Sequence, residues 1–155
     1  MFKVKEIVAG KGSEVWTVSP QNTVLETVQE LAERRVGALV VVNDEGQLVG
    51  VVSERDYTRK VVLQGRSSSN TLVRDIMTSE VVRVGPEDTI KECMGLMTDQ
   101  HVRHLPVLEG EELVGVISIG DVVKTIISNQ QEYIQHLEQY ITGRPAACAP
   151  LVQTR

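Results

Sequence analysis

The chain has 155 residues, of which 41% are hydrophobic and 24% are charged, a composition typical of a folded globular protein. Its 16 basic and 21 acidic residues give a formal net charge of -5, which excludes a dominant nucleic-acid surface because such a surface needs an excess of Lys and Arg. No apolar run is long enough to span a membrane, and the early acid at Glu6 is unlike a secretory signal. We therefore expect a cytoplasmic protein whose partners include neither a membrane nor a nucleic acid.

The first half of the chain predicts a strand, a helix, a hairpin and a second helix, in that order. A short strand ends at Val18. Thr23 and Glu26 have the spacing of a capping box, and apolar residues recur at helical spacing after them. Two short apolar runs, 38–42 and 48–52, are separated by turn residues and therefore predict a β-hairpin. A closing helix follows the second run.

The second half repeats the first. A displacement of 66 residues aligns the first strand and helix, and a one-residue deletion in the hairpin turn reduces the displacement to 65 for the rest. The matched segments and residues are 15–20 with 81–86, Thr23 with Thr89, Glu26 with Glu92, Leu39 with Leu105, 48–53 with 113–118, and Asp56 with Asp121. Because the matches fall at both apolar and polar positions, each half is predicted to be one β-α-β-β-α unit.

The repeat sets the expected domain boundaries. We assign residues 1–65 to the first repeat, 66–74 to a polar linker, 75–127 to the second repeat, 128–143 to a C-terminal helix and 144–155 to an irregular tail. The expected C-terminal helix carries an apolar stripe made of Tyr133, Leu137, Tyr140 and Ile141.

A short signature occurs at matching places in both repeats. Segments 50–56 and 115–121 resemble the Gly-apolar-x-Ser/Thr-x-x-Asp signature of CBS domains, and segment 102–107 is similar to one found in nucleotide-binding CBS domains. The chain thus resembles a stand-alone tandem CBS-domain protein, or Bateman module, over residues 2–127. The resemblance implies an α/β (α+β) fold, with two repeats in a pseudo-twofold pair and a C-terminal helix added. It also implies two clefts, each lined by both repeats.

Members of this family bind AMP, ADP, ATP, NAD(H) or S-adenosylmethionine, and they usually act as sensors without catalytic residues. The resemblance therefore implies an adenosine ligand, no obligatory cofactor, and a regulated partner protein that the sequence does not identify. The first hypothesis is a sensor of energy or redox state that signals by a change of conformation. The alternative is a structural or interaction module with vestigial clefts, which pairs as the homodimer common among CBS pairs.

The resemblance also distributes the ligand contacts between the two clefts. The first cleft would be lined by Val51, Ser53, Arg55, Asp56, Thr78, Glu80, Val81, Val102, Arg103 and His104. The second would be lined by Lys11, Gly12, Ser13, Val15, Gly37, Ala38, Val116, Ser118 and Asp121. In each cleft an Asp would bind the ribose, apolar residues and backbone groups would hold the adenine, and basic residues would meet the phosphate.

The signature residues also have purely structural explanations. Ser53 and Asp56 have the spacing of a capping box, a role that is compatible with ligand binding because a helix N-terminus also attracts anions. Arg55 can also be explained as a solvated charge, Arg103 as a surface charge, and His104 as a side chain fixed by a local hydrogen bond.

The two clefts are predicted to be unequal. Gly120 occupies the position in the second repeat that Arg55 occupies in the first. Conversely, the uncharged pair Gly37 and Ala38 matches the charged pair 103–104. We expect the stronger anion site in the first cleft, where Asp56 and Arg55 join Arg103.

Other chemistries find little support in the sequence. Segment 10–13 lacks the upstream glycine of a phosphate-binding P-loop, and no nucleophile-and-base arrangement is recognisable. Cys93 and Cys148 lie far apart, and the histidines lack ligand spacing, so neither a disulfide framework nor a metal site is expected. The sequence therefore favours a binding protein over an enzyme.

Overall fold

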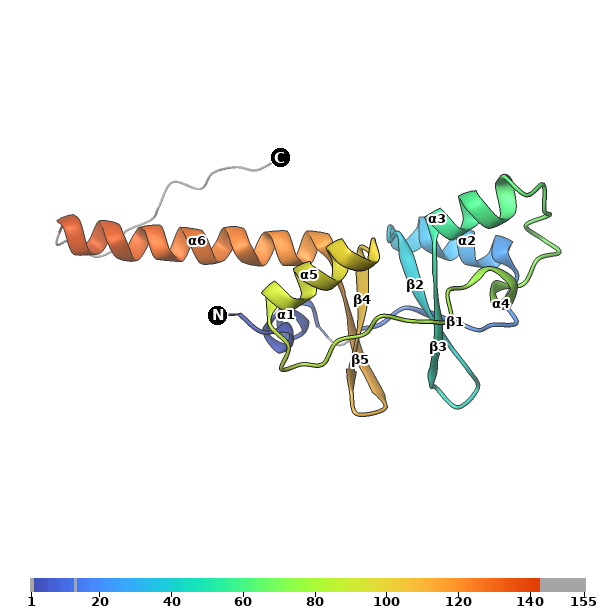
Figure 1. Cartoon of the computed structure of the whole chain (residues 1–155), viewed down its shortest axis with the longest axis horizontal. Helices are drawn as coiled ribbons and strands as arrows, with labels where there is room; N and C mark the ends of the chain where they lie inside the picture. The colour runs from blue at the N-terminus through green and yellow to red at the C-terminus, as the bar shows by residue number, and fades with distance from the viewer. Residues whose placement is uncertain (1, 13, 143–155) are drawn as a thin grey trace.

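The structure is a computed structural model that describes residues 2–12 and 14–142. Two α/β repeats lie beside each other, and a long helix extends away from the second (Figure 1). The first repeat contains β1 (Thr17–Val18), α2 (Val24–Arg34), β2 (Ala38–Val42), β3 (Leu48–Ser53), α3 (Glu54–Tyr57) and the π-helical segment η1 (Thr58–Val62). The second contains α5 (Ile90–Gln100), β4 (His104–Glu109), β5 (Glu112–Ser118) and α6 (Ile119–Thr142). Two further helices, α1 (Val4–Lys11) and α4 (Val73–Ile76), each precede a repeat.

Corresponding helices of the two repeats begin and end alike. The hydroxyl of Thr23 accepts a hydrogen bond from the Glu26 amide at 3.2 Å, and Thr89 does the same for Glu92 at 3.2 Å. These N-caps satisfy amides that a helix start otherwise leaves without partners. The chain then leaves α2 and α5 through a residue in the left-handed conformation, so the backbone reverses at the same place in both repeats.

The two hairpins share one register. Ala38 pairs with Ser53 in the first repeat, and His104 pairs with Ser118 in the second, so the helix that follows each hairpin starts at an equivalent point. The first repeat forms a three-stranded sheet in the order β1-β2-β3. In the second repeat the expected first strand is reduced to one parallel bridge between Val84 and Val107. This structure confirms the predicted α/β class with two repeats.

The segment before each repeat packs against the other repeat. Val4 and Ile7 of α1 belong to the apolar core of the second repeat, together with Leu105 and Ile117. In the same way, α4 supplies two buried residues to the core of the first repeat. The two repeats are therefore tied together by exchanged helices, and a cavity between them has walls from both.

Residues 128–142 are helical as expected, but they continue the closing helix of the second repeat. The predicted break near Ile127 is wrong: α6 runs from Ile119 to Thr142 without interruption. The reason is that no Gly or Pro stands between Asp121 and Thr142, so nothing in the sequence stops the helix. The predicted tail at 144–155 lies outside the described residues. No helix in the described part of the chain is long and apolar enough to cross a membrane.

Candidate functional site

A cavity of about 660 Å³ lies between the repeats, within the range of roughly 300–1,000 Å³ that small-molecule sites occupy. The structure brings together around it every residue predicted for the first cleft. It also adds Gly37, Ala38, Glu54, Arg59, Lys60, Val82, Gln100 and His101. The cavity has walls from β3, α3 and the segments at 78–82 and 100–104. Its volume is large enough for a nucleotide-sized molecule.

One wall of the cavity depends on a close approach of two chain segments. Val51 of β3 exchanges two backbone hydrogen bonds with Thr78, at 3.0 and 2.9 Å. The approach requires glycine at position 50, because a Cβ there would lie 2.8 Å from Met77 Sδ and 3.1 Å from the Thr78 carbonyl oxygen. The glycine of the repeated signature is therefore needed for space next to the cavity.

Ser53 and Asp56 form a complete capping box at the start of α3. The Asp56 amide donates to Ser53 Oγ at 3.2 Å, and the Ser53 amide donates to Asp56 Oδ2 at 2.9 Å. Asp56 Oδ1 lies 3.2 Å from the ammonium of Lys60. The cap fixes the carboxylate at the cavity wall, and each of its oxygens has more than one acceptor position. The structural explanation is therefore correct, and it positions the same carboxylate that a ribose would need.

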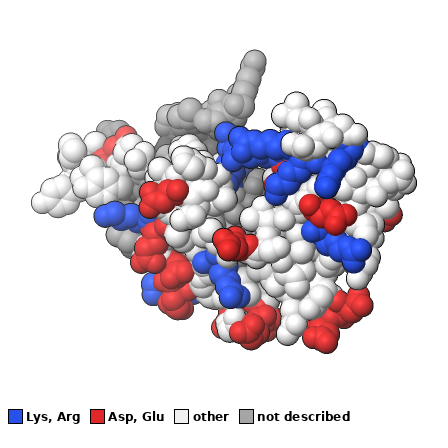
Figure 2. Space-filling view, turned by 45° about the vertical axis from the view of Figure 1, so that its right-hand side comes forward, with Lys and Arg blue, Asp and Glu red and all other residues white. Residues whose placement is uncertain are grey.

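Cations outnumber carboxylates around the cavity. The lining contains four cations, Arg55, Arg59, Lys60 and Arg103, and three acids, Glu54, Asp56 and Glu80. In Figure 2, Lys and Arg side chains gather on the upper part of the face shown, whereas Asp and Glu lie mostly lower down. The lining as a whole therefore favours an anionic ligand.

Two of these cations were missed by the sequence reasoning. Arg59 and Lys60 lie three and four residues after Asp56, so one turn of helix brings them to the same side as that carboxylate. This spacing was the signal that could have found them. Arg55, which was predicted, donates to the carbonyl of His101 at 2.9 Å and so joins the two repeats directly.

His104 lines the cavity next to Gly37 of the first repeat. A Cβ on Gly37 would lie 3.4 Å from His104 Cε1, so the glycine leaves room for the imidazole. Burial lowers the pKa of His104, and the nearby Lys11 ammonium lowers it further, against the opposing effect of Asp121 and Glu54. Because its pKa lies below its ordinary value of 6.5, His104 is mainly neutral at pH 7 and can accept as well as donate a hydrogen bond.

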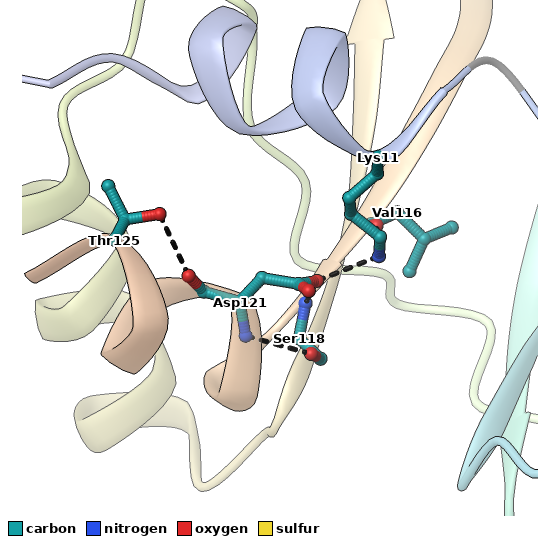
Figure 3. A network of polar contacts seen from close by, with 5 residues as sticks. All are labelled: Lys11, Val116, Ser118, Asp121 and Thr125. Atoms are coloured by element: carbon teal, nitrogen blue, oxygen red, sulfur yellow. Dashed lines mark hydrogen bonds and ion pairs between the residues drawn. The ribbon is translucent and has the colours of Figure 1, made fainter. Parts of the chain in front are cut away.

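Four residues predicted for the second cleft also meet in one network, shown in Figure 3. The Ser118 amide donates to Asp121 Oδ2 at 2.8 Å, and the Asp121 amide donates to Ser118 Oγ at 3.2 Å. Lys11 Nζ donates to the same Oδ2 at 2.7 Å and to the Val116 carbonyl at 2.8 Å. This cleft thus repeats the serine–aspartate cap of the first, with a lysine from α1 placed against the carboxylate.

The other residues predicted for the second cleft lie elsewhere or are not described. Gly37 and Ala38 line the cavity of the first cleft. Gly12 directly follows Lys11 in the chain, and Val15 is half-buried. Ser13 lies outside the described residues. The structure therefore brings together only some of the residues predicted for the second cleft, whereas it brings together all of those predicted for the first.

The only cysteine in the described residues is buried in the core of the second repeat. Burial raises the pKa of the Cys93 thiol to about 11, so it is an unreactive packing residue. Cys148 lies outside the described residues. The arrangement as a whole therefore offers binding chemistry: a fixed carboxylate for hydroxyl groups, a cluster of cations for phosphate, and a histidine able to donate and accept.

Comparison with known proteins identifies both repeats. The family model of the CBS domain matches residues 4–63 and residues 73–128. The mitochondrial CBS domain-containing protein CBSX3 of Arabidopsis thaliana is 43% identical over 136 residues, which are 85% of this chain and 66% of that protein. The chain thus spans about two thirds of the length of this relative.

Solved structures share the arrangement of the repeats. A CBS-domain protein from Burkholderia ambifaria MC40-6 is 46% identical, with a TM-score of 0.79, over 83% of this chain and 96% of that one. A CBS-domain protein from Pyrobaculum aerophilum, solved in complex with AMP, is 29% identical, with a TM-score of 0.70, over 77% of this chain and 89% of that one.

Proposed function

The chain belongs to the CBS domain family, and from this premise we propose that it is a regulatory module that binds a phosphate-bearing adenosine ligand between its repeats. The observation that carries the proposal is the cavity in which Asp56 lies among Arg55, Arg59, Lys60 and Arg103. The AMP complex of the relative from Pyrobaculum aerophilum supports the choice of ligand class.

The charges around the cavity rank the candidate ligands by expected affinity. Cations stabilise phosphate groups through charge-assisted hydrogen bonds, so AMP, ADP, ATP and NAD(H) are favoured. S-adenosylmethionine is disfavoured because its sulfonium is itself a cation. We propose that the ligand reports the energy or redox state of the compartment, which we take to be the cytoplasm.

Ligand binding acts on both repeats because both contribute walls to the cavity. Arg55 already joins α3 to the carbonyl of His101, and a phosphate between the repeats would compete for that guanidinium. A ligand shifts the equilibrium between two arrangements only as far as it binds one better than the other. We propose that the resulting change of angle is what a partner protein detects, with no reaction catalysed.

Replacement of Arg103 by methionine tests the phosphate part of this proposal. Hydrogen bonds to charged groups contribute about 1.5–3 kcal/mol, so Arg103→Met should weaken AMP binding about tenfold or more. It should leave the affinity for adenosine, which has no phosphate, nearly unchanged. Isothermal titration calorimetry with both probes measures the difference.

Arg83→Met is the matched control, because Arg83 is exposed and is not part of the cavity lining. This variant should bind AMP as the unmodified chain does. Equal losses for AMP and adenosine in Arg103→Met would show that Arg103 does not meet the phosphate. Absence of AMP binding to the unmodified chain at millimolar concentration contradicts the proposed function itself.

The exposed face of α6 favours a second candidate function, pairing with another copy of the chain. Ile127, Ile134 and Ile141 recur every seven residues, and Tyr133 and Tyr140 share that interval. All five side chains are exposed, Tyr140 by 90% and Ile141 by 78%. A seven-residue apolar repeat is typical of helices that pack as coiled coils. In this alternative the protein is a homodimeric interaction module, and the clefts are vestigial.

Placing a charge within this stripe tests the second candidate. Ile134→Glu should raise the dimer dissociation constant at least tenfold, because two glutamates would be brought into an apolar seam. Sedimentation velocity over a range of concentrations measures the change. Ser128→Glu adds the same charge at an exposed position of α6 that faces away from the stripe, and it should leave the association intact. A monomeric unmodified chain at high micromolar concentration would contradict this alternative.

A further inference from the structure

Among the residues predicted for the second cleft, the aspartate is already paired with a cation supplied by the chain itself. Lys11 Nζ lies 2.7 Å from Asp121 Oδ2 and 2.8 Å from the carbonyl oxygen of Val116 (Figure 3). Asp121 is the counterpart of Asp56 in the repeat, so its carboxylate is the group that would accept hydrogen bonds from a ribose. An ammonium therefore already engages one oxygen of the carboxylate that is predicted to bind the ribose.

The difference between α1 and α4 explains how the lysine reaches this position. Val8 of α1 packs on Gly115 as Met77, just after α4, packs on Gly50, so the two segments occupy equivalent places. However, α4 has four residues and α1 has eight. After the short helix the chain extends, and the Thr78 amide bonds to the carbonyl of Val51.

In the second repeat the longer helix replaces that backbone contact. α1 continues through Lys11, and its ammonium donates to the Val116 carbonyl, the counterpart of the Val51 carbonyl. The extra turn of α1 therefore replaces a backbone amide with a charged side chain at the Val116 carbonyl.

The contact with Asp121 is an ion pair between a largely buried carboxylate and an exposed ammonium. The Asp121 side chain is 16% exposed and the Lys11 side chain is 42% exposed. Burial pushes the pKa of the Asp121 carboxyl upward, but hydrogen bonds from Lys11 and Ser118 outweigh it, and the net pKa lies below its ordinary value of 3.8. At neutral pH the carboxylate is thus ionised and engaged.

The first cleft differs in the origin of its cation. Lys60 of η1 stands one turn after Asp56 of α3, and its ammonium lies 3.2 Å from Asp56 Oδ1. Lys60 is also held by the Ile76 carbonyl at 2.8 Å. The cation at Asp121, by contrast, is closer and comes from a separate helix that packs on the second repeat.

We propose that Lys11 is a displaceable counter-ion of Asp121 that competes with the ribose of an adenosine ligand for this carboxylate in the second cleft. A ligand enters the second cleft only when Lys11 leaves Asp121. When Lys11 leaves, its hydrogen bond to the Val116 carbonyl also breaks. Ligand binding in the second cleft therefore removes a contact between the end of α1 and β5. This inference rests on the proposed function.

Calorimetry with adenosine on Asp56→Asn variants isolates the second cleft. Adenosine carries the ribose diol but no phosphate, so it offers Lys11 no anion to bind. Lys11→Met keeps the length of the side chain and removes its charge. Because a partly exposed ion pair contributes up to about 1 kcal/mol, we expect Lys11→Met to tighten adenosine binding about fivefold in this background.

Lys5→Met is the matched control, since Lys5 lies on α1 and pairs with Glu87 instead. It should leave adenosine affinity unchanged. An affinity that is unchanged or weaker in Lys11→Met overturns the proposal, and a weaker one makes Lys11 a ligand contact. If the otherwise unmodified chain binds neither adenosine nor AMP, the proposed function fails before the variants are compared, and this proposal falls with it.

A ligand-free measurement checks the position of Lys11 independently. The charge of Lys11 is one cause of the lowered pKa of His104, so Lys11→Met should raise that pKa in an NMR titration. Lys5→Met should not. An unchanged His104 titration in Lys11→Met contradicts the contact from which the proposal is built.

Discussion

Substitution of Asp56 by asparagine is expected to weaken AMP binding to the full chain at least tenfold. The Asp56 carboxylate is fixed at the cavity wall by the Ser53 amide, and a charged acceptor for ribose hydroxyls is worth about 1.5–3 kcal/mol per hydrogen bond. Asparagine keeps the shape but loses the charge and turns one acceptor into a donor. Titration calorimetry with AMP measures the loss, since a tenfold change in affinity corresponds to about 1.4 kcal/mol.

The control for this experiment is Asp75→Asn. Asp75 Oδ2 accepts a hydrogen bond from the Leu72 amide at the start of α4, so it has the same capping role, but it does not line the cavity. Loss of AMP affinity confined to Asp56→Asn would separate ligand contact from helix capping. An equal loss in both variants would mean that the caps, rather than a ribose contact, control binding.

Truncation of Ile117 to alanine is expected to lower the free energy of unfolding by about 2–5 kcal/mol, which is the range for removal of a large buried aliphatic side chain. Ile117 is fully buried in β5 among Leu105, Val107 and the α1 residues Val4 and Ile7. Urea denaturation followed by circular dichroism measures the change. Because α1 shares this core, the loss should also loosen the contact between Lys11 and the second cleft.

Ile119→Ala removes the same atoms from a position two residues further along the chain. Ile119 begins α6 and is 48% exposed, so its truncation should lower the free energy of unfolding by well under half as much. Similar losses for Ile117→Ala and Ile119→Ala would contradict the assignment of β5 to the core of the second repeat.

The internal repeat made much of the fold predictable. Once Leu39 was aligned with Leu105 and Asp56 with Asp121, one unit of structure applied to both halves, and the two hairpins indeed share a register. Apolar periodicity and capping residues are local signals, so the helices at 24–34 and 90–100 could be placed from sequence.

Long-range packing was not predictable in this way. The helices α1 and α4 are short, and nothing local shows that each packs on the repeat it does not precede. The extent of α6 was misjudged because a boundary between the second repeat and the C-terminal helix was placed after residue 127, although the helix continues across it.

Only part of the candidate site was predicted, for a related reason. The resemblance supplied Asp56, Arg103 and the rest of the first set, and the structure places all of them around one cavity. Arg59 and Lys60 follow the signature and belong to no motif, so only the helical turn between Asp56 and Lys60 shows where they point. Whether these residues contact a ligand remains a prediction.

The most direct test of the central claim is a crystal structure of the chain grown with a saturating concentration of AMP. The proposed function predicts AMP in the cavity between the repeats, with the ribose on the carboxylate of Asp56 and the phosphate toward Arg103. An empty cavity, or AMP bound only outside it, would contradict the claim.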